Sequence, residues 1–237
     1  MTARRGLLWP SLFWLALFVI LVGLGVWQLQ RLRWKEGLIA QLNATIARPP
    51  TALPAATSLR ELEFHHVKFA GTFLNQGELY HHAIAANGNP GFDVITPLQI
   101  QGGAIVFVNR GFVPENRRDP ATRAAGEIAG PTIVTGLLRL PEHRPSWFTP
   151  ANEPAKNLWF SMDLPAMATA DRLTQVMPFY VDADATPLPG GYPVGGQTDT
   201  KLPNDHLQYA LTWFGLAALV PIYYFLFVRR WRKERKA

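Results

Sequence analysis

The sequence contains no cysteine. Disulfide bonds and thiolate metal ligands are therefore excluded, and a domain in an oxidising compartment would have to be stable through packing alone. The common signatures of enzymes are missing as well, because no G-x-S-x-G, phosphate-binding loop, H-E-x-x-H or G-x-G-x-x-G motif occurs. The chain also has no internal repeat. The sequence therefore shows no recognisable catalytic constellation.

Charged residues are missing from two long stretches of the chain. Leu7 to Trp27 and Leu207 to Val228, of 21 and 22 residues, contain no Asp, Glu, Lys or Arg. Helices of this length span roughly 30 Å, the thickness of a bilayer's hydrocarbon core. The sequence therefore predicts two membrane-spanning helices. The first stretch could instead be a signal peptide, because Arg4 and Arg5 precede it, but it exceeds a typical signal core and no A-x-A cleavage site follows.

The cationic residues predict the orientation of these helices. Because Lys and Arg concentrate on the cytoplasmic side, both termini are expected in the cytoplasm and the middle of the chain outside it. Arg31, Arg33 and Lys35 oppose this orientation, but the cluster in the C-terminal tail is larger. Too few residues precede the first helix for a mitochondrial transit peptide, so we expect a bacterial inner membrane and a periplasmic domain. The tail explains most of the net charge of +6 and predicts contact with lipid headgroups rather than nucleic acid; its cations are Arg229, Arg230, Arg232, Lys233, Arg235 and Lys236.

Three regions follow from these features. Residues 1–30 comprise an N-terminal stub and the first membrane helix, 31–203 an extracytoplasmic domain, and 204–237 the second helix and the basic tail. Between Arg31 and Asn43 apolar residues recur near helical spacing, so the first helix is expected to continue outward. The proline-rich segment ARPPTALPAA then ends it, because proline removes backbone donors.

The middle region reads as a series of short strands. Candidates are FHHVKFAGTF, two strands within ELYHHAIAANGNPGFDVITPLQI, GGAIVFVNRGFVP, GPTIVTGLLRLP, NLWFSMD and PFYVDADA. The turn from Asn87 to Gly91 joins the second strand to the third, and one helix is expected from Leu164 to Leu173. This spacing predicts a mostly-β domain, an antiparallel barrel or sandwich.

Polar groups of this region offer few candidates for chemistry. The pairs His65-His66 and His81-His82 could form a copper or zinc site, but neighbouring residues on a strand point to opposite faces. Arg110 at a strand end could clamp a carboxylate, although pairing with a neighbouring acid is the simpler interpretation. The sequence DADA, which contains Asp182 and Asp184, is typical of a solvated edge.

The strongest candidate is a histidine at the outer edge of the second helix. Tyr209, Ala210 and Trp213 share the helical face of His206. In an antiparallel hairpin the end of the first helix lies at the same depth, which places Trp27, Gln28 and Arg31 there; Gly23 and Gly25 permit close packing. A histidine, aromatic rings and an arginine suit haem, whose iron histidine ligates and whose propionates arginine can pair. An ordinary aromatic belt remains the alternative.

Nearly the whole chain resembles the Surfeit locus protein 1 family. The resemblance rests on LGVWQLQRLRWKEGLI, NPGFDVITPL, VFVNRGFVPENRR, RPSWFTPANEPAKNLWFSMDLPAMA and NDHLQYALTWFGLA, in this order between the two apolar stretches. Phe112 stands where the family often has tryptophan.

The resemblance implies an assembly factor, not an enzyme, for haem-copper cytochrome oxidase. It implies binding of haem a and its delivery to the oxidase subunit that carries it, with other assembly factors and the bilayer as further partners. By position, His206 corresponds to the family's histidine implicated in ligating haem iron, while the roles of Trp27, Gln28, Arg31, Tyr209 and Trp213 come from the arrangement above. A periplasmic copper-handling factor and a scaffold that binds no haem are the alternatives.

Overall fold

The computed structural model describes residues 5–54, 59–85, 88–141 and 146–235. Arg4 and Lys236, Asn87 of the predicted turn, and the end of the ARPPTALPAA segment lie outside these residues. The chain divides into two compact units, one formed by Met1–Gln41 with Lys201–Ala237 and the other by Leu42–Thr200. Each unit is described by itself.

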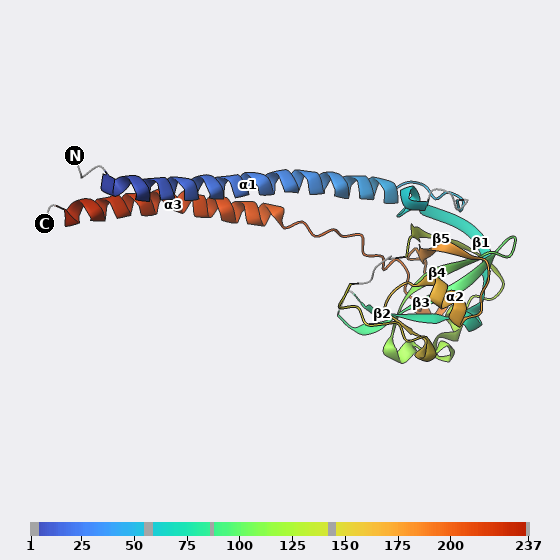
Figure 1. The fold of residues 1–237 in the computed structure, drawn as a ribbon. Helices are drawn as coiled ribbons and strands as arrows, with labels where there is room; N and C mark the ends of the chain where they lie inside the picture. The colour runs from blue at the N-terminus through green and yellow to red at the C-terminus, as the bar shows by residue number, and fades with distance from the viewer. Residues whose placement is uncertain (1–4, 55–58, 86–87, 142–145, 236–237) are drawn as a thin grey trace. The chain divides into compact units, whose positions relative to one another are not determined.

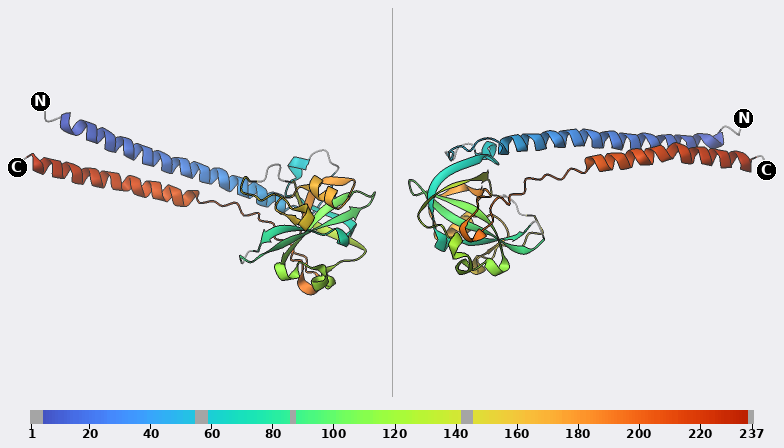
Figure 2. Two further views of the ribbon diagram at one scale, coloured as in Figure 1. Left: turned by 60° about the horizontal axis from the view of Figure 1, so that its bottom comes forward. Right: turned by 180° about the vertical axis from the view of Figure 1, so that it is seen from behind.

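The first unit consists of two long helices, α1 (Arg5–Ile46) and α3 (His206–Glu234). They lie side by side and run in opposite directions (Figure 1 and Figure 2). Both are long and apolar enough to cross a membrane. That both apolar stretches are helical is confirmed, and so is the continuation of the first helix, because α1 runs unbroken past Asn43 and ends before the prolines at 49 and 50.

The two helices pack through small and aliphatic residues. Leu21 of α1 is buried with Ala217 and Val220 of α3. One turn further along α1, a Cβ atom added to Gly25 would come within 2.6 Å of the Phe214 ring. The Phe214 ring therefore packs directly against the backbone of α1 at Gly25, a close approach that small residues permit between helices.

The second unit is a mostly-β domain. Its strands are β1 (His66–Phe73), β2 (Leu79–Ile84), β3 (Pro90–Ile100), β4 (Ile105–Pro114), β5 (Pro131–Arg139), β6 (Leu158–Trp159) and β7 (Val176–Ala183). β1 to β6 fall within predicted segments, and β7 begins two residues before the predicted segment PFYVDADA. The predicted helix is also present, as α2 (Leu164–Ala170), where the Asp163 side chain accepts a hydrogen bond from the Ala166 amide and caps the first turn.

These strands form one sheet that closes on itself. The order is β1-β5-β7-β4-β3-β2-β6, and an additional pairing of β1 with β3 closes a small barrel, with β2 and β6 beyond β3. Figure 1 labels β1 to β5 of this sheet. The expected antiparallel pairing holds for most of the sheet, but β4 pairs with β7 and β2 with β6 in parallel. Parallel neighbours need a long connection, and residues 115–175, which include β5 and α2, provide one between β4 and β7.

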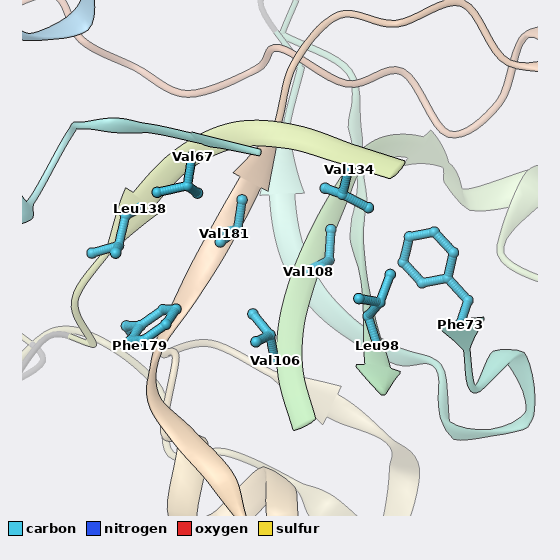
Figure 3. Packing of buried hydrophobic residues seen from close by; sticks show 9 residues of the cluster. All are labelled: Val67, Phe73, Leu98, Val106, Val108, Val134, Leu138, Phe179 and Val181. Atoms are coloured by element: carbon cyan, nitrogen blue, oxygen red, sulfur yellow. The ribbon is translucent and has the colours of Figure 1, made fainter. Parts of the chain in front are cut away.

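The barrel interior is filled by alternate side chains of its strands. Figure 3 shows this cluster, in which Val106 and Val108 of β4 meet Val181 of β7. A second cluster on the opposite face of the sheet packs under α2, with Trp159 and Phe107 fully buried. Each such buried side chain contributes about 1.5–3 kcal/mol to stability, which replaces the disulfides that the sequence lacks.

Candidate functional site

The end of the helix pair at which α3 begins brings two predicted site residues into direct contact. His206 is the first residue of α3, and its Nδ1 lies 2.7 Å from Oε1 of Gln28 on α1. Gln28 is buried, with only 8% of its surface exposed, because the helices close over it. A buried amide needs a hydrogen-bond partner, and the imidazole provides it. The pair joins positions 178 residues apart.

This hydrogen bond determines which nitrogen of His206 carries the proton. The carboxamide oxygen can only accept, so Nδ1 must donate its N–H to Gln28. In the neutral ring, Nε2 is then unprotonated and keeps its lone pair. Among the residues that the structure describes, Nε2 has no hydrogen-bond partner. His206 therefore has the tautomer of a metal-ligating histidine, whose second nitrogen is held by an acceptor.

Aromatic residues and an arginine lie on neighbouring turns of the two helices. The Arg31 guanidinium lies 6.0 Å from the Trp27 ring and 4.9 Å from the Trp34 ring, all on α1. Tyr209 is 55% exposed on the first turn of α3, whereas Trp213 packs against the buried seam around Leu21. Sequence reasoning did not select Trp34, although its position three residues after Arg31 is the spacing of helical neighbours.

Four of the predicted residues thus form two separate pairs. The structure brings His206 together with Gln28, and Arg31 together with Trp27. It records no direct contact of Tyr209 or Trp213 with either pair within the described residues. A planar ligand with an iron atom and carboxylates fits this set, because it could use the Nε2 lone pair, exposed aromatic faces and a cation.

The whole chain compares closely with proteins of known family. The model of the SURF1 family matches residues 15–218. Surfeit locus protein 1 of mouse is 39% identical over 225 residues, which cover 88% of this chain and 72% of the mouse protein. The rat protein is 38% identical over 92% of this chain and 76% of its own length. The human protein is 39% identical, covering 86% and 72%.

The chain belongs to the SURF1 family. The matched region contains most of α1, the first part of α3 with Gln28 and His206 included, and the complete β domain between them. The identification from sequence segments is therefore confirmed.

In this SURF1-family chain, Arg110 is part of a buried ionic cluster. Its guanidinium lies 3.3 Å from Glu78 and donates to the Gly126 carbonyl, while Arg123 lies 2.5 Å from Glu78 and 2.6 Å from Glu127. Burial, together with the charge of Glu78, raises the pKa of Glu127. Pairing of Arg110 with acids is confirmed. Its N–H groups bind an acidic side chain and a carbonyl of the same domain, so they do not form an open site for a carboxylate ligand.

The histidine pairs do not come from neighbouring strands. His66 of β1 lies opposite Leu137 of β5, whereas His81 of β2 lies opposite Asp93 of β3. The His66 ring contacts the Ile46 carbonyl and Asp184, and the His82 ring lies against Phe160. The described residues contain no group of three His, Asp or Glu side chains suited to a metal ion.

The interpretation of Asp182 as part of a solvated edge was wrong. Only 7% of Asp182 is exposed, and its carboxylate accepts hydrogen bonds from Asn109, Arg139 and Thr198. Nearby, burial and the negative charge of Asp182 raise the pKa of Asp93 to about 6. Sequence alternation could not reveal this burial, because the segment that contains Thr198 covers the strand only in the folded chain.

Proposed function

We propose that this protein assists the assembly of cytochrome c oxidase by holding haem a at the outer end of the α1–α3 pair. Membership of the SURF1 family, whose members are oxidase assembly factors, supports the assembly role. The hydrogen bond between Gln28 and His206 supports haem binding, because it leaves the Nε2 lone pair of His206 available to iron. His206 is the proposed iron ligand.

The other residues of the site bind and orient the ligand. Gln28 holds the proton on Nδ1 of His206 and fixes the plane of the ring. Trp27, Tyr209 and Trp213 supply aromatic surface for the macrocycle, and Arg31 supplies a positive charge for a propionate. Haem supplies the redox-active iron that the oxidase needs, and this chain performs no reaction on it.

The proposed location follows from the two apolar helices. Both cross the inner membrane of a bacterium, and the β domain lies in the periplasm. There it meets the haem-bearing oxidase subunit and other assembly factors. The haem site then lies at the outer membrane–water boundary, where iron is within reach of a membrane partner and carboxylates remain hydrated.

Substitution of the proposed ligand tests this function. His206→Ala should insert normally, because the change lies outside the apolar stretch, but the protein purified from cells that make haem a should contain much less haem or show a shifted Soret band. Gln28→Leu should lower haem affinity by roughly 10- to 100-fold, since it removes the acceptor that orients the ligand. The matched control is Gln208→Ala, an exposed residue of the same turn of α3. A His206→Ala protein with the haem content and spectrum of the wild type would refute the proposal.

A further inference from the structure

Arg31 has the geometry of a prepared anion site. Its guanidinium carbon lies 6.0 Å from the centroid of the Trp27 ring and 4.9 Å from that of the Trp34 ring. Aromatic rings at these distances attract the cation and restrict its rotation, but they do not use its N–H groups as hydrogen-bond donors, as a carboxylate would. Arg31 has no ion pair or hydrogen bond with any other residue that the structure describes.

A positive charge at the position of Arg31 is also unusual. In the proposed orientation it lies on the outer side of the membrane, where Lys and Arg are disfavoured. A planar cation that is held by two indoles and lacks an acidic neighbour is suited to a bidentate carboxylate or phosphate. The ligand of the neighbouring site contains carboxylates.

Helix geometry places Arg31 on the same side of the helix pair as Tyr209. Gln28 and His206 face each other across two antiparallel helices, which a local twofold axis relates. Arg31 follows Gln28 by three positions, and Tyr209 follows His206 by three. The twofold axis therefore relates Arg31 to Tyr209, and both side chains project from the same side of the helix pair. Because the helices run in opposite directions, Arg31 lies further out and Tyr209 further in, roughly 9 Å apart along the axis.

We propose that the carboxylates of the bound haem point outward to Arg31, and that the macrocycle extends inward past His206 along Tyr209. Trp34 acts as a positioning residue, since it stacks on the guanidinium and aims its N–H groups at the carboxylate. This inference rests on the proposed function and adds the side of the helix pair, the orientation of the ligand and the role of Trp34.

A comparison of haemin with its dimethyl ester tests the inference on the detergent-purified full chain. The two probes share iron and macrocycle, but the ester has no carboxylate charge. Soret titration should show that the wild type prefers the free acid by roughly three- to tenfold, the range of a charge-assisted pair at a partly wet site. Arg31→Gln and Trp34→Leu should each reduce this preference toward one, and Trp34→Phe should restore most of it.

Arg33→Gln is the matched control. It removes the same charge from the same helix, but two positions from Arg31 rotate the side chain by about 200° to the other side. This variant should keep the preference of the wild type. Equal loss in Arg33→Gln would mean that only net charge matters, which would overturn the inference.

The remaining outcomes separate this inference from the function on which it rests. If haemin and its ester bind equally and binding still requires His206, the orientation is wrong and the haem site stands. If neither probe binds in a His206-dependent way, both proposals fail. If Arg31→Gln and Trp34→Leu instead reduce retention of phosphatidylglycerol without changing the ester preference, Arg31 binds a lipid phosphate and the carboxylate assignment is overturned.

Discussion

At the scale of single residues, the most informative ionisable group of the β domain is Asp93. Burial and the charge of Asp182 raise its pKa from 3.8 to about 6. Between about pH 4 and 6 the Asp93 carboxyl is protonated in the folded state and ionised in the unfolded state. The free energy of unfolding therefore falls as pH rises through that window. The loss is complete above pH 6.

We expect Asp93→Asn to stabilise the domain at pH 7.5. The amide keeps the size of the side chain but cannot ionise, and a shift of this size corresponds to about 2–3 kcal/mol. The advantage in thermal midpoint, measured by circular dichroism of the full chain in detergent, should shrink below pH 5. Glu115→Gln, which removes an exposed carboxylate, should change little at either pH. An advantage independent of pH would contradict the assignment.

Glu78 illustrates the opposite case, a charge that the fold needs. It faces both Arg110 and Arg123, and all three side chains are almost completely buried. Glu78→Ala should therefore destabilise the β domain by about 3–5 kcal/mol, because two buried guanidinium groups lose their shared partner. Glu153→Ala breaks the exposed pair with Lys156 and should cost less than about 1 kcal/mol. Urea titration of both variants would distinguish the two costs, and equal values would exclude a structural role for the cluster.

At the scale of elements, Gly25 controls how closely α1 and α3 approach. A side chain there would collide with Phe214, whereas Gly23 has nothing within 4 Å of an added Cβ. Gly25→Leu should separate the helices and, one turn away, break the contact of Gln28 with His206, while Gly23→Leu should be tolerated. Because the chain has no cysteine, Leu21→Cys with Ala217→Cys reports the packing through disulfide yield in membranes. Similar yields in both glycine variants would contradict this role.

The elements themselves could largely be predicted from the sequence, whereas their partners could not. Apolar stretches and the alternation of apolar and polar residues are local features of the sequence, so they predict α1, α3 and the seven strands. The parallel pairing of β4 with β7 and the closure of β1 on β3 depend on distant segments. For the site, sequence reasoning placed Gln28 and His206 at one depth, but only the packed helices show their hydrogen bond.

At the scale of the whole molecule, positive and negative charges are separated along the chain. Residues 42–200 contain 11 Lys and Arg and 14 Asp and Glu, a net charge of −3. The excess of cations therefore lies in the helical unit, above all in the tail that follows α3. Because a domain with a net negative charge is not attracted to anionic lipid surfaces, we expect the basic tail rather than the β domain to interact with lipid headgroups.

The cationic residues after α3 and those at positions 31–35 favour opposite topologies, and their effects can be tested separately. Fusions of alkaline phosphatase, which is active only outside the cytoplasm, should be inactive after Ala237 and active after Gly190. Replacing Arg31, Arg33 and Lys35 by Gln should leave this pattern unchanged, because these residues oppose the orientation. Replacing Arg229, Arg230, Arg232 and Lys233 by Gln should make a fraction of the C-terminal fusions active, since the dominant signal is then weakened. Active phosphatase after Ala237 in the unaltered chain would reverse the topology, and the His206–Gln28 pair would then face the cytoplasm.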